Sequence, residues 1–252
     1  MYLYEMHCHT NIASKCAQIS PKEIVHAYHS QGFAGIVITD HFFNGNCTVG
    51  CSLPWNEMVE KYCSAYEQAK VEGDKIGLKV FFGFEYSSNN NPLGREGYKD
   101  RNPSSGTDFL IYGLDKEWLL SKDKSILELS VNEFMKMVRQ DGGFVVQAHP
   151  FRLEKAYMDH ISLFPNFTDG VEVLNASPNT MGRANNLAKK YAKEYNFYRL
   201  AGSDAHQNGD REYFAVLKTV NKANTIEELI REIKDRTTKV AFKKNKFCKR
   251  KK

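Results

Sequence analysis

Hydrophobic residues occur along the chain in short runs that alternate with amphipathic stretches, a pattern typical of β-strands separated by helices. The runs predict strands over residues 2–6, 35–41, 78–86, 108–114, 144–150, 169–175, 197–206 and 213–220. Capping signals at Ser20, Ser130 and Thr225 predict the starts of three helices, and helical patterns cover residues 54–76 and 179–195. The repeated order of strand then helix predicts an α/β fold with a parallel sheet. Eight strands in 252 residues favour a barrel over an open, doubly wound sheet.

Charge is distributed unevenly along the chain. There are 35 Lys and Arg against 30 Asp and Glu, but residues 237–252 contain eight of the basic residues and no acid. The first 236 residues therefore carry 27 basic and 30 acidic groups, a net charge of −3. We expect residues 1–236 to form a single barrel domain and residues 237–252 to form a basic C-terminal tail. Because a dedicated nucleic-acid binder is typically basic throughout, nucleic acid stays open as a partner but is not favoured.

Cysteine usage and the N-terminus indicate the compartment. The six cysteines are irregularly spaced and include no C-x-x-C pair, which favours free thiols in a reducing environment. The chain begins without the basic and apolar segments of a secretory signal, and no apolar run is long enough to span a membrane. We therefore expect a cytoplasmic protein with no membrane partner. The polar stretch 87–107 is expected to be a long loop after a strand.

Histidines gather at one end of the predicted sheet. Five of the eight stand at or just after the C-terminal ends of predicted strands, and carboxylates accompany them. The histidines are His7, His9, His41, His149 and His206, and the acids are Asp40, Glu85, Asp108 and Asp204. In parallel α/β folds the C-terminal ends of the strands meet on one side of the sheet. Because imidazole with carboxylate is the ligand mixture for Zn, Mn or Fe, the sequence predicts a metal centre there.

Five spaced motifs resemble those of one known family. They are His7-Cys8-His9-Thr10, Thr39-Asp40-His41, Gly83-Phe84-Glu85, Ala148-His149-Pro150 and Gly202-Ser203-Asp204-Ala205-His206. In this order they resemble the motifs of the PHP (polymerase and histidinol phosphatase) family, over residues 1 to about 220. The resemblance implies a distorted (β/α)7 TIM-like barrel. It also implies a phosphoesterase site with two or three divalent metal ions at the C-terminal mouth of the strands.

The resemblance further implies how two ions are held. The ligands of the first would be His7, His9, Glu85 and Asp204. Glu85 would bridge to a second ion held also by His149 and by Asp108, at a position where family members often have His. A carboxylate is a suitable oxygen ligand, so we expect the second site to survive the replacement.

A third ion, where the family has one, would be held by His41, His206 and a His six residues after the H-x-H motif. That position in this chain is Lys15. An ammonium group cannot ligate a cation and repels it, so we expect the third site to be impaired. The alternatives for Lys15 are a contact with the substrate phosphate and a solvated position in a loop.

The resemblance implies hydrolysis of a small phosphomonoester by a metal-activated hydroxide, without a covalent enzyme intermediate. Histidinol phosphate, a nucleotide and a sugar phosphate are all compatible with such a site. Asp204 or His206 would manage the proton of the leaving group. Arg152 is the favoured phosphate contact and catalytic candidate, and Arg183 and Arg211 are weaker candidates, because a guanidinium group binds phosphate bidentately.

Two rival functions remain open. The chain is alternatively a nuclease or phosphodiesterase that acts on nucleotides or oligonucleotides. The other rival is a non-catalytic PHP module that binds nucleic acid, with the basic tail supplying the contact. The second rival is less favoured because most of the implied ligand positions are intact.

Overall fold

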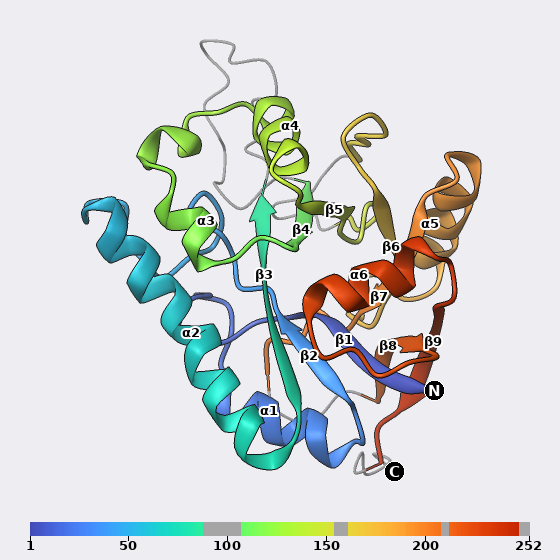
Figure 1. Cartoon of the computed structure of the whole chain (residues 1–252). Coiled ribbons are helices and arrows are strands. Elements are labelled where there is room, and N and C mark those ends of the chain that lie inside the picture. Colours follow the sequence, from blue (N-terminus) through green and yellow to red (C-terminus); the bar gives the residue numbers. More distant parts are fainter. Residues whose placement is uncertain (88–106, 154–160, 208–211, 247–252) are drawn as a thin grey trace.

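The computed structural model of the protein describes residues 1–87, 107–153, 161–207 and 212–246. The strands are β1 (Tyr2–Cys8), β2 (Gly35–Ile38), β3 (Lys79–Ser87), β4 (Asp108–Tyr112), β5 (Phe144–Gln147), β6 (Gly170–Asn175), β7 (Tyr198–Gly202), β8 (Tyr213–Thr219) and β9 (Lys239–Lys244). The helices are α1 (Pro21–Ser30), α2 (Trp55–Ile76), α3 (Lys116–Leu120), α4 (Val131–Gln140), α5 (Arg183–Glu194) and α6 (Ile226–Lys234), with a 3₁₀ helix, η1 (Lys124–Leu127). Helices surround the strands (Figure 1).

All nine of these strands belong to one sheet, in the order β7-β6-β5-β4-β3-β2-β1-β8-β9. The pairs β1–β2, β2–β3, β5–β6 and β6–β7 are parallel. The end of β1 also meets the segment after β7, because Cys8 bridges Ala205 and the amide of His9 donates to the carbonyl oxygen of Ala205 at 2.9 Å. The mixed α/β fold therefore has a nearly closed, barrel-like sheet.

The prediction of a wholly parallel sheet is wrong at β4 and β8. Both strands run antiparallel to each of their neighbours. As a result, Asp108, the first residue of β4, lies opposite Ser87, the last residue of β3. A side chain at the start of β4 thus reaches the same mouth of the barrel as side chains at the ends of the parallel strands. The nine-stranded sheet does not confirm the implied count of seven β/α units.

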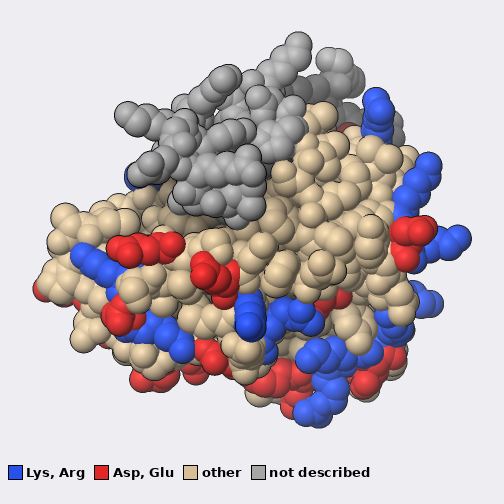
Figure 2. Space-filling view, turned by 90° about the horizontal axis from the view of Figure 1, so that it is seen from above, with Lys and Arg blue, Asp and Glu red and all other residues tan. Residues whose placement is uncertain are grey.

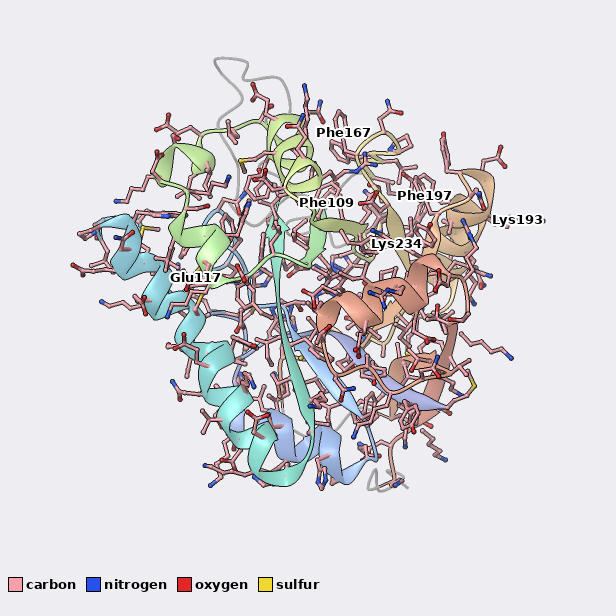
Figure 3. All side chains as sticks on the ribbon, viewed as in Figure 1. Phe109, Glu117, Phe167, Lys193, Phe197 and Lys234 are labelled. Atoms are coloured by element: carbon pink, nitrogen blue, oxygen red, sulfur yellow. The ribbon has the colours of Figure 1, made fainter. Side chains whose placement is uncertain are left out.

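Apolar side chains fill the barrel interior. The cluster combines residues of seven strands with one face of α6: Tyr4, Met6, Val37, Phe81, Leu110, Tyr112, Phe144, Val146, Leu200, Leu217, Leu229, Ile230 and Ile233. Because β8 runs away from the mouth, α6 follows it at the opposite end and closes the barrel there. The ammonium group of Lys234 in α6 lies 5.6 Å from the ring centre of Phe144 (Figure 3). Because α6 closes one end of the barrel, a functional site can form only at the other end, the mouth.

A β-bulge in β1 decides which side chains face the interior. The pairing with β2 shifts by one residue between Glu5 and Cys8. Met6 packs inside the barrel. Cys8 packs outside it, in the apolar cluster that includes residues of α1. The extra residue reverses the alternation of sides, so His7 and His9 both turn inward.

A second bulge shapes β6. Its pairing with β7 shifts between Glu172 and Leu174, and both Val173 and Leu174 pack outside, in the cluster that contains residues of α5. Glu172 and Asn175 are consequently both inside, where the Asn175 amide donates to Glu172 Oε2 at 2.9 Å. Bulges commonly re-aim side chains beside functional sites.

The predicted helix starts are confirmed. Ser20 and Ser130 each form a complete capping box, with a reciprocal contact from Glu23 and Glu133, and Thr225 caps α6. Three short elements, α3, η1 and β9, were not predicted. Short elements give too few residues for a periodic pattern to emerge.

Part of the basic segment 237–252 belongs to the sheet. Lys239–Lys244 forms β9, which pairs antiparallel with β8. Residues 247–252 lie outside the described residues, as do residues 88–106 of the predicted loop. Within the described parts of the chain, no helix combines the length and the apolar character that a membrane span requires.

Candidate metal centre

Four buried side chains converge where β1 ends. The Nε2 atoms of His7 and His9 are 3.1 Å apart. Each lies 3.2–3.5 Å from a carboxylate oxygen of Glu85, at the end of β3, and of Asp204, after β7. Four donors bound tetrahedrally at roughly 2.0–2.2 Å from an ion would be about 3.3–3.6 Å apart. The donor atoms of the four side chains are therefore spaced nearly as they would be around a bound cation.

Glu85 links this cluster to a second one. Its Oε1 is 3.2 Å from His7 Nε2 and 3.4 Å from His149 Nε2, and the latter atom is 3.8 Å from Asp108 Oδ2. Glu85, Asp108 and His149 together present donor atoms within 4.8 Å of one another. One carboxylate is therefore shared between two sets of ligand atoms, as the resemblance implies.

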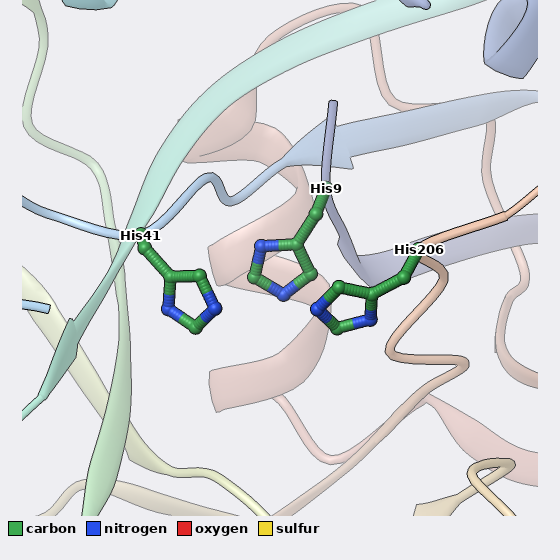
Figure 4. Close-up of side chains that lie close together, drawn as sticks. All are labelled: His9, His41 and His206. Carbon is green, nitrogen blue, oxygen red and sulfur yellow. The ribbon is translucent and has the colours of Figure 1, made fainter. Parts of the chain in front are cut away.

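Three stacked imidazoles form a third group. The ring of His9 lies 4.5 Å from that of His41 and 4.3 Å from that of His206 (Figure 4). One nitrogen of each ring lies within 4.8 Å of the others. His41 Nδ1 is 2.9 Å from Glu85 Oε2, and His206 Nδ1 donates to the carbonyl oxygen of Asp204 at 3.0 Å. The opposite nitrogens of His41 and His206 face the space between the two rings.

The residue near this third group is Cys16, and Lys15 occupies a solvated position in the loop, which is one of its two alternatives. Lys15 is exposed, and its amide donates to Asn46 O at 2.9 Å. The half-buried thiol of Cys16 instead forms hydrogen bonds with the imidazoles of His206 and His41. Burial would raise the pKa of the Cys16 thiol, but these hydrogen bonds lower the pKa to about 6.

Glu172, which belongs to none of the sequence motifs, contacts His7 and His149 on the side away from the cluster of ligand atoms. Its Oε1 is 3.1 Å from His7 Nδ1, and its Oε2 accepts the backbone N–H of His149 at 2.9 Å. A carboxylate at Nδ1 keeps the Nε2 lone pair of His7 directed at the cluster. The available signal was an acid in a mainly apolar strand, Gly170–Asn175. Asp40 also supports the site from outside, because its carboxylate accepts hydrogen bonds from Thr10 and Ser14.

Two ligand candidates have strained backbones. His149 has φ of 27° and Asp204 has φ of 52°, values that side chains with a Cβ rarely adopt. The contact of the His149 amide with Glu172 helps hold the first of these conformations. Such strain persists only where the surroundings enforce it, and it concentrates at functional sites.

The charges of Glu85, Asp204 and His9 suit cation binding, whereas His7 without a cation favours its protonated form. Burial alone would raise the pKa of Glu85 and of Asp204, but His7 and other imidazoles lower both far below their usual values. Burial and the neighbouring His206 and His41 lower the pKa of His9 well below its usual value. Both carboxylates are thus ionised and His9 is neutral, the forms that bind a metal. Burial would lower the pKa of His7, but Asp204, Glu172 and Glu85 raise it well above its usual value.

Unsatisfied polar atoms indicate the same occupant. Within the described residues, His41 Nδ1, Glu85 Oε2 and His149 Nε2 are buried and lack a hydrogen bond of good geometry. Buried polar atoms are nearly always satisfied. Because all three atoms lie next to ligand groups, the residues fit a site for divalent ions.

Of the three predicted phosphate-binding arginines, Arg152 lies at the centre. Its Nη1 is 2.9 Å from Asp204 Oδ2, and its Nη2 is 3.8 Å from Asp108 Oδ2. Arg183 is exposed at the first position of α5. Arg211 lies outside the described residues.

Comparison with known proteins agrees with this geometry. The family model of the PHP domain matches residues 5–247. No curated protein matches the chain. A two-domain protein from Bacteroides vulgatus that contains a predicted PHP-like metal-dependent phosphoesterase superposes with a TM-score of 0.67 at 15% identity, over 95% of this chain. The chain spans 64% of the length of that protein.

Two further structures share the fold at a lower TM-score of 0.53. One, from Bifidobacterium adolescentis, is named as a candidate metal-dependent phosphoesterase and is 14% identical, over 92% of this chain and 96% of its own. The other is an amidohydrolase from Chromobacterium violaceum with bound sulfate and no metal, 13% identical over 97% and 98% of the two chains. At these identities the likeness establishes the fold alone.

Proposed function

Because this chain belongs to the PHP domain family, we propose that it is a metal-dependent phosphoesterase that hydrolyses a small phosphomonoester. The observation that carries the proposal is the position of Glu85. Its carboxylate lies within 3.4 Å of ring nitrogens of four histidines: His7, His9, His41 and His149. A carboxylate shared in this way suits two ions placed side by side.

Two divalent ions, Zn, Mn or Fe, fit the nitrogen and oxygen donors. The first would be held by His7, His9, Glu85 and Asp204, and the second by Glu85, His149 and Asp108. Bound there, the ions would polarise the phosphoryl oxygens and lower the pKa of an attacking water. The protein's part is to fix the ligands, which it does through Glu172 and the strained backbones.

Arg152 is placed to orient the phosphate. Its guanidinium group stands beside carboxylates of both ligand sets, Asp204 and Asp108. A guanidinium carries five N–H donors, and bidentate binding of two phosphate oxygens requires only two of them. Replacing Arg152 with Lys should therefore raise KM more than it lowers kcat.

Proton transfer to the leaving group is assigned to Asp204 or His206. The side chain of His206 is 26% exposed, the most accessible imidazole of the cluster. Because its Nδ1 donates to a backbone carbonyl, its Nε2 is the nitrogen free to exchange a proton or to meet a cation. Asp204 is nearly buried and ion-paired with Arg152, which favours His206 for contact with solvent.

The charge of the residues coloured in Figure 2 supports a small substrate more than nucleic acid. On the face that Figure 2 presents, Lys and Arg are interspersed with Asp and Glu. A protein that binds nucleic acid without base contacts concentrates positive charge along the path of the backbone. The rivals, a nuclease or a non-catalytic binding module, become outcomes of the same experiment.

The test is phosphate release from a panel of phosphomonoesters, with phosphodiesters, oligonucleotides and amides assayed for hydrolysis beside them, by chelator-treated protein reloaded with Zn, Mn or Fe. Glu85→Gln removes the shared charge while keeping the size of the side chain, and Glu194→Gln, on the exposed side of α5, is the matched control. We expect activity that requires added metal and is lost only in Glu85→Gln. Phosphate release that survives chelation or the Glu85 substitution would refute the proposal. Activity confined to phosphodiesters, oligonucleotides or amides would assign one of the other reactions.

A further inference from the structure

Ser14 is buried where the chain passes from β1 toward α1. The residue is fully enclosed, and its amide donates to the carbonyl oxygen of Thr10 at 3.0 Å. Ser14 also forms an isolated antiparallel bridge with Cys47. The backbone therefore fixes where the hydroxyl group of Ser14 lies.

This hydroxyl group contacts three different partners. The Oγ of Ser14 is 2.7 Å from Asp40 Oδ1, 3.0 Å from the backbone nitrogen of His41 and 3.2 Å from His9 Nδ1. Asp40 Oδ1 also accepts the backbone N–H of Thr10 at 2.6 Å, so it acts as an acceptor toward Ser14 as well. The single proton of the hydroxyl group is consequently donated to Asp40.

The lone pairs of the hydroxyl group then determine the tautomer of His9. A hydroxyl oxygen has two lone pairs. The backbone N–H of His41 can only donate and uses one of them, so the other faces His9 Nδ1. Two opposed lone pairs at 3.2 Å would repel each other, and Nδ1 therefore carries a proton. Because burial above all lowers the pKa of His9 well below its usual value, the ring is neutral and its Nε2 keeps a lone pair.

We propose that Ser14 is a positioning residue for the first ion. Its hydroxyl group, oriented by Asp40, holds His9 in the tautomer with the proton on Nδ1. The Nε2 lone pair of His9 then faces Glu85 and Asp204, whose nearest carboxylate oxygens lie 3.4 Å away. The inference rests on the metal centre of the proposed function, but it does not depend on which bond is hydrolysed.

The two histidines of the H-x-H motif are thus oriented by different groups. His7 Nδ1 contacts the carboxylate of Glu172 directly, whereas His9 is linked to the carboxylate of Asp40 only through Ser14. Loss of a partner behind a ligating histidine typically weakens metal binding about 10–100-fold. A neutral hydroxyl group forms a weaker hydrogen bond than a carboxylate does, so we expect the loss of the Ser14 hydroxyl to lie at the lower end of that range.

The tautomer is tested by NMR on chelator-treated, ¹⁵N-labelled full-length protein. An imidazole nitrogen that carries a proton resonates far from one that carries a lone pair, and the signals of His9 are identified by their loss in His9→Gln. We expect the wild type to carry the proton on Nδ1. In Ser14→Ala the proton should move to Nε2, because Nδ1 has lost its acceptor while Glu85 and Asp204 can still accept from Nε2.

Zinc affinity, measured by competition with a chelator, is the second readout. Ser14→Ala should bind zinc about 10-fold more weakly than the wild type. The matched control is Thr219→Val, which removes a buried hydroxyl group at the closed end of the barrel, where it donates to the carbonyl oxygen of Asn221. We expect Thr219→Val to keep both the wild-type affinity and the wild-type tautomer of His9.

Three results would each overturn the inference: a wild type with the His9 proton on Nε2, an unchanged tautomer in Ser14→Ala, or equal zinc affinity in Ser14→Ala and the wild type. The first needs no variant, so it decides the matter even if Ser14→Ala does not fold. If the tautomer and the zinc affinity are as expected but no substrate releases phosphate, the proposed hydrolysis fails and the role of Ser14 stands.

Discussion

Glu172 offers a sharp test of how the protein prepares its metal ligands. The substitution Glu172→Gln keeps the size of the side chain but replaces one acceptor oxygen with an NH₂ donor. The native carboxylate contacts His7 Nδ1 on one side and accepts N–H groups of His149 and Asn175 on the other, at 2.9–3.1 Å. A glutamine cannot satisfy both sides.

Each orientation of the amide has a cost. If its NH₂ group faces His7, the imidazole must accept at Nδ1 and carry its proton on Nε2, the atom directed at the cation. If the NH₂ group faces His149 and Asn175, it meets their N–H groups, and these buried donors are left without an acceptor. The loss of stability is about 1–3 kcal/mol. Loss of a partner behind a ligating histidine typically weakens metal binding about 10–100-fold. That range corresponds to about 1.4–2.7 kcal/mol.

The measurement is the metal dissociation constant, obtained by competition with a chelator on apo protein. Glu194→Gln, which alters an exposed glutamate of α5, should bind like the wild type. Circular dichroism establishes that the variants are folded. If Glu172→Gln binds Zn²⁺ as tightly as the wild type, the orienting role assigned to Glu172 is wrong.

Three further predictions address the fold and the ligands. Gly202→Ala should destabilise the protein by about 1–3 kcal/mol in denaturant titration, because a Cβ would collide with the His7 side chain. Gly50→Ala, whose Cβ would meet the Ser52 hydroxyl at an ordinary contact distance of 3.9 Å, is its control, and equal losses would contradict the reasoning. Ser130→Ala should cost about 1 kcal/mol by removing the α4 cap, and an unchanged Tm would argue against that role. Chelation should lower the Tm, since metal at 100 times its dissociation constant adds about 2.7 kcal/mol of stability; a Tm insensitive to metal would speak against a site in the native state.

Helix starts were predictable because they depend on adjacent residues. The Ser130 hydroxyl and the Glu133 carboxylate meet across one turn, so their spacing in the sequence is their spacing in space. Strand direction is different. The hydrophobic run at β4 indicates a strand that is buried on both faces. A strand can be buried in this way whether it runs parallel or antiparallel to its neighbours. The reversal of β4 and β8 could therefore not be inferred from the pattern.

The ligand set was predictable where it follows strand ends and was missed elsewhere. Five histidines and two of the acids that face them, Glu85 and Asp204, stand in motifs, but Glu172 lies within β6, before the bulge, where no motif marks it. Counting residues from His9 pointed to Lys15. The path of the loop, fixed by backbone hydrogen bonds, brings Cys16 to the imidazoles instead.

The reversed direction of β4 has a consequence for diversification within the family. Ser87 and Asp108 are paired neighbours at the rim, so the 20 residues between them depart from and return to adjacent positions. A segment anchored in this way can be exchanged for one of different length or composition without shifting the ladder beneath it. Grafting this stretch between relatives would thus be a modular route to new substrate preferences on an unaltered scaffold.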